Sequence, residues 1–226
     1  PILIAELALG RNARGDAIQV FQRLTRHRIW HLGGGLGILG SFLVMSFYFV
    51  VAGWVLKYLY GALSGGLWRL AGESYGGYFD AFISHPLEPL GWQTLVMVLA
   101  AAVVGGGVQQ GIERSARVLM PVLAVLLLGL ALYSSTKSGA GPGLAFLFEP
   151  DWSHLSHPKI DVAALGQAFF SLSIGMAVFI TYGSYLADGH RIPGAALTVV
   201  AGDTLIAVAA GVLIFTAVFA HGMDPA

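Results

Sequence analysis

Long apolar runs alternate with short polar stretches along the whole chain, and the runs have the length of membrane-spanning helices. A helix needs about 20 mostly apolar residues to cross a bilayer core. The pattern predicts a partial span at residues 1–9 and five further spans, at residues 38–63, 92–108, 112–133, 162–186 and 195–220. We therefore expect an all-α polytopic membrane protein with a single transmembrane domain over residues 1–226.

Composition supports this class and excludes several others. Hydrophobic residues make up 56% of the chain and charged residues only 11%, whereas soluble domains have about 45–50% and about 25%. The absence of cysteine excludes disulfides, thiol chemistry and thiolate metal sites. Because the chain begins without Met and inside an apolar run, we expect it to be an internal fragment of a longer protein.

The arginine distribution predicts the orientation, because cytoplasmic loops carry an excess of Lys and Arg. Alternate connections hold eight basic residues on one side and four on the other, and every connection on the richer side is short. The richer side is therefore expected to be cytoplasmic. It carries Arg11, Arg14, Arg23, Arg26, Arg28, Arg114, Arg117 and Arg191, and the poorer side carries Lys57, Arg69, Lys137 and Lys159.

The connections between spans differ in length. Two long loops that contain proline, at residues 68–91 and 134–160, are expected to face outward, the first with room for a short helix. A glycine cluster at residues 33–37 is expected to lead into the second span. Residues 111–117 are expected to form a tight polar connection.

The stretch Gly166–Tyr185 has an unusual centre for a spanning helix. Ser171, Ser173 and Gly175 lie within five residues, where a spanning helix should be strongest. Non-helical backbone at membrane depth survives only where it is buried in protein or lines a cavity. In secondary transporters, such breaks bind substrate and coupling ions. Small residues also let membrane helices pack closely, so the pattern leaves both interpretations open.

Three polar side chains lie within apolar runs. Asp203 is well inside the last span, where a carboxylate by default indicates an ion or substrate pathway; the alternatives are a hydrogen bond to a nearby hydroxyl or protonation. Glu6 is expected to be solvated or paired with an arginine, because it lies close to Arg11. Tyr48 lies near the middle of its span and needs a partner for its hydroxyl. Asp203 and Ser171, together with a substrate carboxylate, would give the oxygen-only shell that an alkali cation needs.

Other chemistries have little support. No Ser–His pair lies at one membrane depth, since all histidines fall in loops or at helix ends, so an enzyme is not expected. The glycines at 33–37 lack the strand–turn–helix setting of a phosphate loop. Nucleic-acid binding has no basis in the sequence. The histidines are His27, His31, His85, His154, His157, His190 and His221.

Four motifs together resemble the neurotransmitter:sodium symporter family, in its bacterial amino-acid transporter branch. They are PILIAELALGR, GIERSARVLMP, FLFEPDW and GQAFFSLSIGMAVFITYGSYL, in that order and at similar separations. The resemblance covers essentially the whole chain, from the end of the second family helix to just past the seventh. It implies the leucine-transporter fold, with two inverted five-helix repeats and with substrate and sodium near the middle of the bilayer.

The resemblance also implies residue roles. Tyr48 would hold the substrate carboxylate, Phe170 would close over the substrate, and Gln167 would belong to the external gate. Ser171 and Asp203 would bind sodium, and Ser171 would also line the substrate site. The remaining positions expected in the side-chain pocket are Val44, Ser173 and Met176. The family's helices 1 and 8, outside this sequence, would complete the substrate and sodium sites.

Two departures from the family pattern refine the expected function. Asp203 stands where many members have Asn, and Ala207 lacks the polar side chain found there in others, so a fixed charge could replace chloride. Met176 and Val44 suggest a deformable pocket for a hydrophobic L-amino acid, aromatic ones included. We therefore expect sodium-coupled, chloride-independent symport by alternating access in the bacterial inner membrane. Proton coupling through Asp203 and an amino-acid sensor without transport are the alternatives.

Overall fold

The fold is known from a computed structural model, which describes residues 1–70, 75–137, 140–150, 152–153 and 157–223. Every regular element in these ranges is helical. The expected loops at 68–91 and 134–160, the motif at 146–152 and His154 lie in part or wholly outside the described residues. The chain divides into two compact units, residues 1–40 with 119–226, and residues 41–118, which are described separately.

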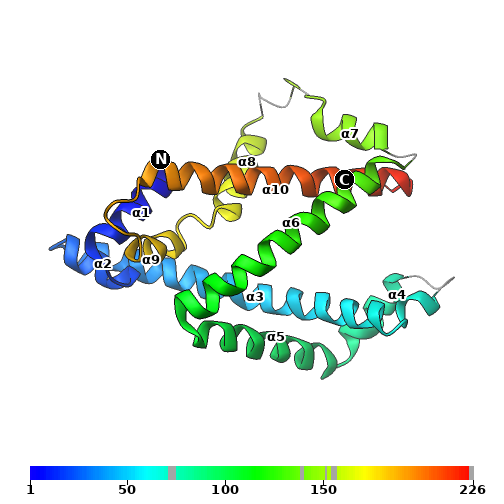
Figure 1. Cartoon of the computed structure of the whole chain (residues 1–226), viewed down its shortest axis with the longest axis horizontal. Coiled ribbons are helices and arrows are strands. Elements are labelled where there is room, and N and C mark those ends of the chain that lie inside the picture. The colour runs from blue at the N-terminus through cyan, green and yellow to red at the C-terminus, as the bar shows by residue number, and fades with distance from the viewer. Residues whose placement is uncertain (71–74, 138–139, 151, 154–156, 224–226) are drawn as a thin grey trace. The chain divides into compact units, whose positions relative to one another are not determined.

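The first unit contains both ends of the chain (Figure 1). Its helices are α1 (Ile2–Ala13), α2 (Ala17–Leu24), a short 3-10 turn η1 (Arg28–Trp30) and the start of α3 (His31–Leu63), followed by most of α6 (Arg114–Ser135) and by α7 (Ala140–Phe148), α8 (Pro158–Ser171), α9 (Val178–Ser184) and α10 (Ile192–Ala220).

Close helix packing in the first unit depends on glycine. A Cβ on Gly10 of α1 would lie 1.9 Å from the carbonyl oxygen of Ile180 in α9, and one on Gly183 would lie 2.5 Å from that of Leu7. The α1 and α9 backbones are therefore in direct contact, as small residues permit in membrane proteins. Gly143 of α7 approaches the backbone of α10 in the same way, because its Cβ would lie 2.7 Å from the carbonyl oxygen of Phe215.

Helix α2 connects this packing to the broken helix. Asp16 caps its N-terminus by accepting the Gln19 N–H at 2.8 Å, which satisfies one of the free amides of the first turn. Its inner face buries Ala17 and Val20 in one apolar cluster with Ala13, Ala177 and Ile180. A helix of eight residues is marginal alone, so this burial holds α2 in place.

The second unit contains the rest of α3, a 3-10 turn η2 (Leu67–Leu70), α4 (Tyr75–Ser84), α5 (Glu88–Gly105) and a π-helical turn η3 (Val108–Glu113). Lys57 of α3 pairs with Glu88 at the start of α5, and its ammonium lies over the rings of Tyr78 and Phe82 on α4. One lysine thus connects α3, α4 and α5. Trp54 adds an edge-to-face contact with Phe79 at 5.1 Å.

Several observed bounds differ from the sequence expectations. The glycines at 33–37 are part of α3. Their missing side chains let this helix lie close to Ala17, at Gly34, and to Ala177, at Gly37. Helix α7 occupies part of the expected loop at 134–160, and its Pro142 falls in the first turn, where proline is tolerated. Helix α5 begins at Glu88 rather than residue 92, with proline in its first turn.

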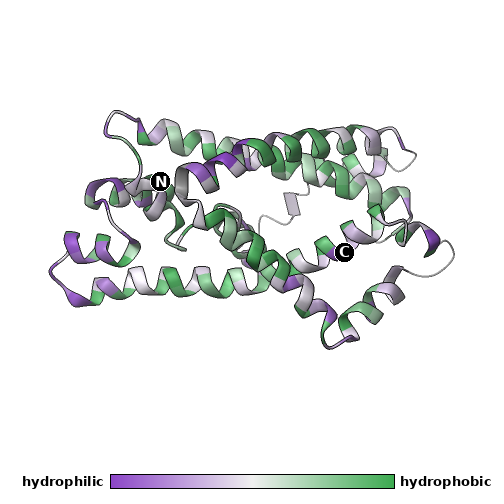
Figure 2. Ribbon diagram, turned by 60° about the horizontal axis from the view of Figure 1, so that its bottom comes forward, coloured by the Kyte–Doolittle hydropathy of each residue, from purple (hydrophilic) through white to green (hydrophobic). Residues whose placement is uncertain are grey.

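Four helical segments are long and apolar enough to cross a membrane by length and composition: Arg28–Leu63, Glu88–Gly105, Gln110–Ser135 and Ile192–Ala220. Figure 2 shows hydrophobic residues along the helices and hydrophilic ones gathered at turns and ends. The segment at 158–184 is not among the four, because it is split into two shorter helices.

Candidate functional site

The centre of the site is the break between α8 and α9. Helix α8 ends at Ser171, α9 begins at Val178, and residues 172–177 form turns. Ser173, Gly175 and Ala177 have positive φ angles of 51°, 83° and 61°. The left-handed conformation costs a non-glycine residue about 1–2 kcal/mol, and such strain persists only where its surroundings enforce it.

Asp203 of α10 lies beside the last residue of α8. The Ser171 hydroxyl is 2.7 Å from Asp203 Oδ1 and 2.8 Å from Oδ2, and donates its hydrogen to this carboxylate. The structure therefore brings together the two side chains expected to bind sodium. It also contains the hydrogen bond to a nearby hydroxyl that was the alternative explanation for Asp203. Thr204 donates its own hydroxyl to the Val200 carbonyl.

The expectation for Glu6 was wrong. Its side chain is 7% exposed, and Oε1 accepts the Gly175 N–H at 2.7 Å, in the middle of the break. Oε2 is buried and has no hydrogen-bond partner among the described residues. The break thus has a carboxylate at each side, with Asp203 on the end of α8 and Glu6 on the turn. The sequence signal was present, because Glu6 stands in an apolar run.

A cavity of about 260 Å³ adjoins Glu6. Its walls come from α1, α2, the start of α3 and the turn before α9. Apart from the carboxylate of Glu6, its side chains are apolar, so Glu6 supplies its only side-chain charge. The lining residues are Ile2, Ala5, Glu6, Leu9, Phe21, Gly33, Gly37, Gly175, Ala177 and Ile180.

The remaining expected residues divide between the two units. Gln167 and Phe170 lie on the last turns of α8, and both are exposed; Ser173 and Met176 are half-buried in the break. Tyr48 and Val44 lie on the part of α3 that belongs to the second unit, where the Tyr48 ring has an edge-to-face contact with Phe47 at 6.2 Å.

The donor set fits a hard cation better than a transition metal. Ser171 and Asp203 offer hydroxyl and carboxylate oxygens, and oxygen ligands suit hard ions. Across the described residues, no three His, Cys, Asp or Glu side chains are grouped as metal ligands. A cation near Ser171 Oγ could be shared with Asp203, whose negative charge would offset the ion's own charge.

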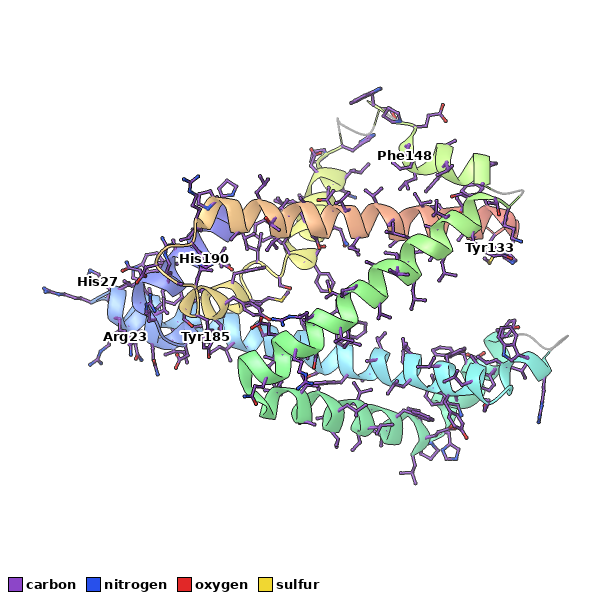
Figure 3. The ribbon with its side chains drawn as sticks, in the orientation of Figure 1. Arg23, His27, Tyr133, Phe148, Tyr185 and His190 are labelled. Atoms are coloured by element: carbon purple, nitrogen blue, oxygen red, sulfur yellow. The ribbon has the colours of Figure 1, made fainter. Side chains whose placement is uncertain are left out.

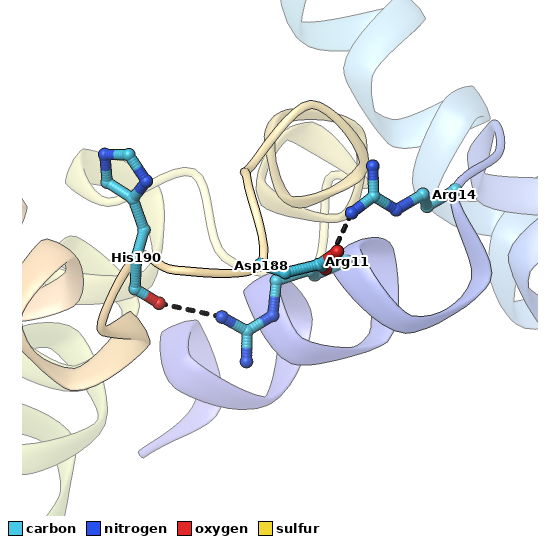
Figure 4. A network of polar contacts seen from close by, with 4 residues as sticks. All are labelled: Arg11, Arg14, Asp188 and His190. Carbon is cyan, nitrogen blue, oxygen red and sulfur yellow. Dashed lines mark hydrogen bonds and ion pairs between the residues drawn. The ribbon is translucent and has the colours of Figure 1, made fainter.

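At the polar end of α1, two arginines hold the turn between α9 and α10 (Figure 4). Arg11 donates to the His190 carbonyl at 2.8 Å, and Arg14 pairs with Asp188 at 2.6 Å. Both contacts are solvent-exposed, so the hydrogen bond of Arg11 and the ion pair of Arg14 each contribute little alone. Together they keep the turn beside the end of α1.

These features are those of a polytopic membrane protein whose broken helix has carboxylates on both sides. The family model described as "Sodium:neurotransmitter symporter family" matches residues 83–222. The chain belongs to this sodium:neurotransmitter symporter family.

Two relatives of this chain are both described as sodium-dependent transporters. The chain is 40% identical over 225 residues to the uncharacterized sodium-dependent transporter YhdH of Bacillus subtilis, covering all of this chain and 50% of that protein. It is 32% identical to an uncharacterized sodium-dependent transporter of Haemophilus influenzae, covering all of this chain and 51% of that one. The chain thus spans about half the length of these curated relatives.

A solved structure gives the same result for the fold. The crystal structure of MhsT in complex with L-phenylalanine matches with a TM-score of 0.93 and 49% identity, over all of this chain and 51% of that one. This match confirms the expected all-α polytopic fold, a partial leucine-transporter fold. It also confirms the family resemblance on which the expectation rested.

Proposed function

We propose that the protein containing this chain is a sodium-coupled symporter of a hydrophobic L-amino acid, aromatic ones included, that works by alternating access without chloride. The observation that carries the proposal is the Ser171–Asp203 pair at the broken helix. The 49% identical MhsT, solved with L-phenylalanine, supports an aromatic substrate.

Sodium is a transported ion in this proposal, and Ser171 and Asp203 bind it. In the structure the Ser171 hydrogen points to the carboxylate, so the lone pairs of Oγ remain for a cation. An ion bridging Oγ and the carboxylate would satisfy both groups without another negative ligand. This is why chloride is dispensable: Asp203 supplies the charge that would otherwise have to come from an anion.

The substrate residues follow the family resemblance. Tyr48 binds the substrate carboxylate, and Phe170 closes over the side chain, with Gln167 in the external gate. Val44, Ser171, Ser173 and Met176 line the pocket. The flexible Met176 accommodates side chains of different shape. Helices outside this chain complete the substrate and sodium sites.

The bilayer is the other partner, and the arginine-rich loops face the cytoplasm of a bacterial inner membrane. The network at Arg11 and Arg14 supports this orientation, because it brings the turn that carries Arg191 to the end of α1. Arginines from two distant parts of the sequence therefore share one side, as the excess of basic residues predicts.

The test is uptake of labelled phenylalanine, leucine and tryptophan into proteoliposomes containing the full-length protein. We expect uptake to require an inward sodium gradient, to fail in potassium, and to persist when gluconate replaces chloride. Asp203→Asn should raise the sodium concentration needed for half-maximal uptake or create chloride dependence. Asp161→Asn, an exposed carboxylate at the start of α8, is the matched control and should behave as wild type.

Other outcomes identify the alternatives. Uptake driven by a pH gradient and indifferent to sodium would make the protein a proton-coupled transporter through Asp203. Saturable binding with no uptake would make it a sensor of the same fold. Loss of wild-type uptake in gluconate would disprove chloride independence alone.

A further inference from the structure

The arginines between residues 11 and 28, at one end of the first unit, fall into two groups. Arg11, Arg14 and Arg23 all bond to protein, with Arg23 donating to the carbonyls of Ala13 and Arg14 at 2.6 and 2.8 Å. The side chains of Arg26 and Arg28 are exposed and have no hydrogen bond or ion pair within the described residues. Figure 3 shows Arg23 and His27 at this end of the molecule. The free pair therefore offers its guanidinium groups to an external partner.

The residues that follow the free pair are apolar and exposed. Ile29 is 71% exposed, Trp30 58% and Leu32 63%. They lie where the first candidate span begins, at Arg28. Tryptophan is enriched at the membrane–water interface, where its ring lies at the depth of the lipid headgroups. Cations next to exposed apolar side chains at the start of a spanning helix match a lipid, which has a charged head and an apolar chain.

We infer that residues 26–30, here termed the Arg26–Trp30 surface, bind the phosphate headgroup of an anionic phospholipid in the leaflet on the arginine-rich side. Arg26 and Arg28 bind phosphate oxygens, since a guanidinium can donate two parallel hydrogen bonds to them. Trp30 and Ile29 contact the glycerol and upper acyl region. Each basic residue near an anionic surface contributes about fivefold to the affinity, so two contribute about 25-fold.

The Arg26–Trp30 surface is connected to the broken helix through α2. Val20, which is fully buried, packs in the cluster with Ala177 and Ile180, next to the break. Arg23, at the end of α2, is bonded to the end of α1. A lipid held at Arg26 and Arg28 therefore fixes the loop that holds α2 against the start of α9. Lipid binding should raise the thermal stability of the folded state, as any ligand specific for it does.

The experiment is native mass spectrometry of the purified full-length protein with phosphatidylglycerol or phosphatidylcholine added in turn. Wild type should retain phosphatidylglycerol preferentially, and the preference should weaken as salt rises. R26Q/R28Q should bind phosphatidylglycerol about 25-fold more weakly. R69Q/R114Q is the matched control: it removes the same charge from two exposed arginines elsewhere in the described chain, whose side chains also have no hydrogen bond or ion pair there, and it should retain the lipid.

Thermal melts in detergent give an independent readout. Phosphatidylglycerol should raise the melting temperature of wild type and R69Q/R114Q, but not of R26Q/R28Q. Equal loss of lipid in the two double variants, or equal retention of the two lipids by wild type, would overturn the proposal. If R26Q/R28Q does not fold, phosphatidylglycerol adducts of wild type that are insensitive to salt would overturn it. None of these readouts depends on transport.

Discussion

The contact between α1 and α9 makes Gly10→Ala the most informative substitution in this chain. The new Cβ would lie 1.9 Å from the Ile180 carbonyl oxygen, 2.8 Å from its carbon and 2.9 Å from the Ser184 nitrogen. All three are backbone atoms, so no side-chain rotation removes the overlap. Ordinary contact begins at 3.4 Å, so the helices would have to separate by about 1.5 Å.

The expected cost comes from two opposing effects. Overpacking of this kind costs about 1–3 kcal/mol, and alanine in place of glycine gains about 0.8–1.0 kcal/mol of helix propensity. The two effects leave a net loss of up to about 2 kcal/mol, near the upper end here because the clash is between backbones, and more if the separation spreads along the helices. It would also stretch the bond between Glu6 and Gly175, since these residues belong to the same two segments.

The assay is thermal unfolding of the full-length protein in detergent, together with hydrogen exchange at residues 172–177. We expect a melting temperature several degrees below wild type and faster exchange in the break. Gly35→Ala is the control, because a Cβ on Gly35 of α3 has nothing within 4 Å in the described structure. If both variants melt at the wild-type temperature, the α1 and α9 backbones are not in direct contact at Gly10.

Three further predictions concern polar contacts. Glu6→Ala should speed exchange of the Gly175 amide and cost about 1.5–3 kcal/mol, because a buried donor loses a charged acceptor; Glu6→Gln should cost about half as much, and no change in exchange with either variant would contradict this. Lys57→Met and Glu88→Gln should show a coupling of about 0.5–1 kcal/mol in a double-mutant cycle, kept small by the 36% exposure of the Glu88 side chain; a coupling that does not weaken with salt would argue against an ion pair. Thr216→Val should cost about 1–3 kcal/mol, because it leaves the buried Ser134 hydroxyl without this partner. The double variant Ser134→Ala/Thr216→Val should cost less than Thr216→Val alone, since it removes both polar groups. Thermal melts of wild type and the two variants test this order.

Sequence alone gives the class, the fold and the existence of a special stretch at residues 166–185. Apolar runs of spanning length are a strong signal, and hydroxyls with a glycine in such a run are unusual. The pairing of Ser171 with Asp203 was expected from their oxygen chemistry in apolar runs and from the family resemblance. It joins residues 32 positions apart on different helices, and no spacing rule within one element indicates such a contact.

Other features were out of reach because they depend on packing between distant segments. Glu6 lies 169 positions from Gly175, and the usual rule for a carboxylate near arginines predicted the wrong partner. The same holds for the glycines at 33–37, which were expected to precede the span at 38–63 rather than to belong to its helix. They belong to α3, and glycine is needed in this helix because it passes close to Ala17 and Ala177. In both cases tertiary contacts override the local signal.

The contacts of Arg11 and Arg14 constrain how many times the chain crosses the bilayer. They bring the turn at residues 188–190 to the end of α1, so α1 ends and α10 begins on one face of the membrane. A path that leaves a face and returns to it makes an even number of crossings. Helices α3, α5 and α6 have the length and composition for one crossing each; if each crosses once, the broken segment supplies the fourth crossing. Helix α8 is about 21 Å long and α9 about 10 Å, so neither half spans the hydrocarbon core alone and the two cross it only in series.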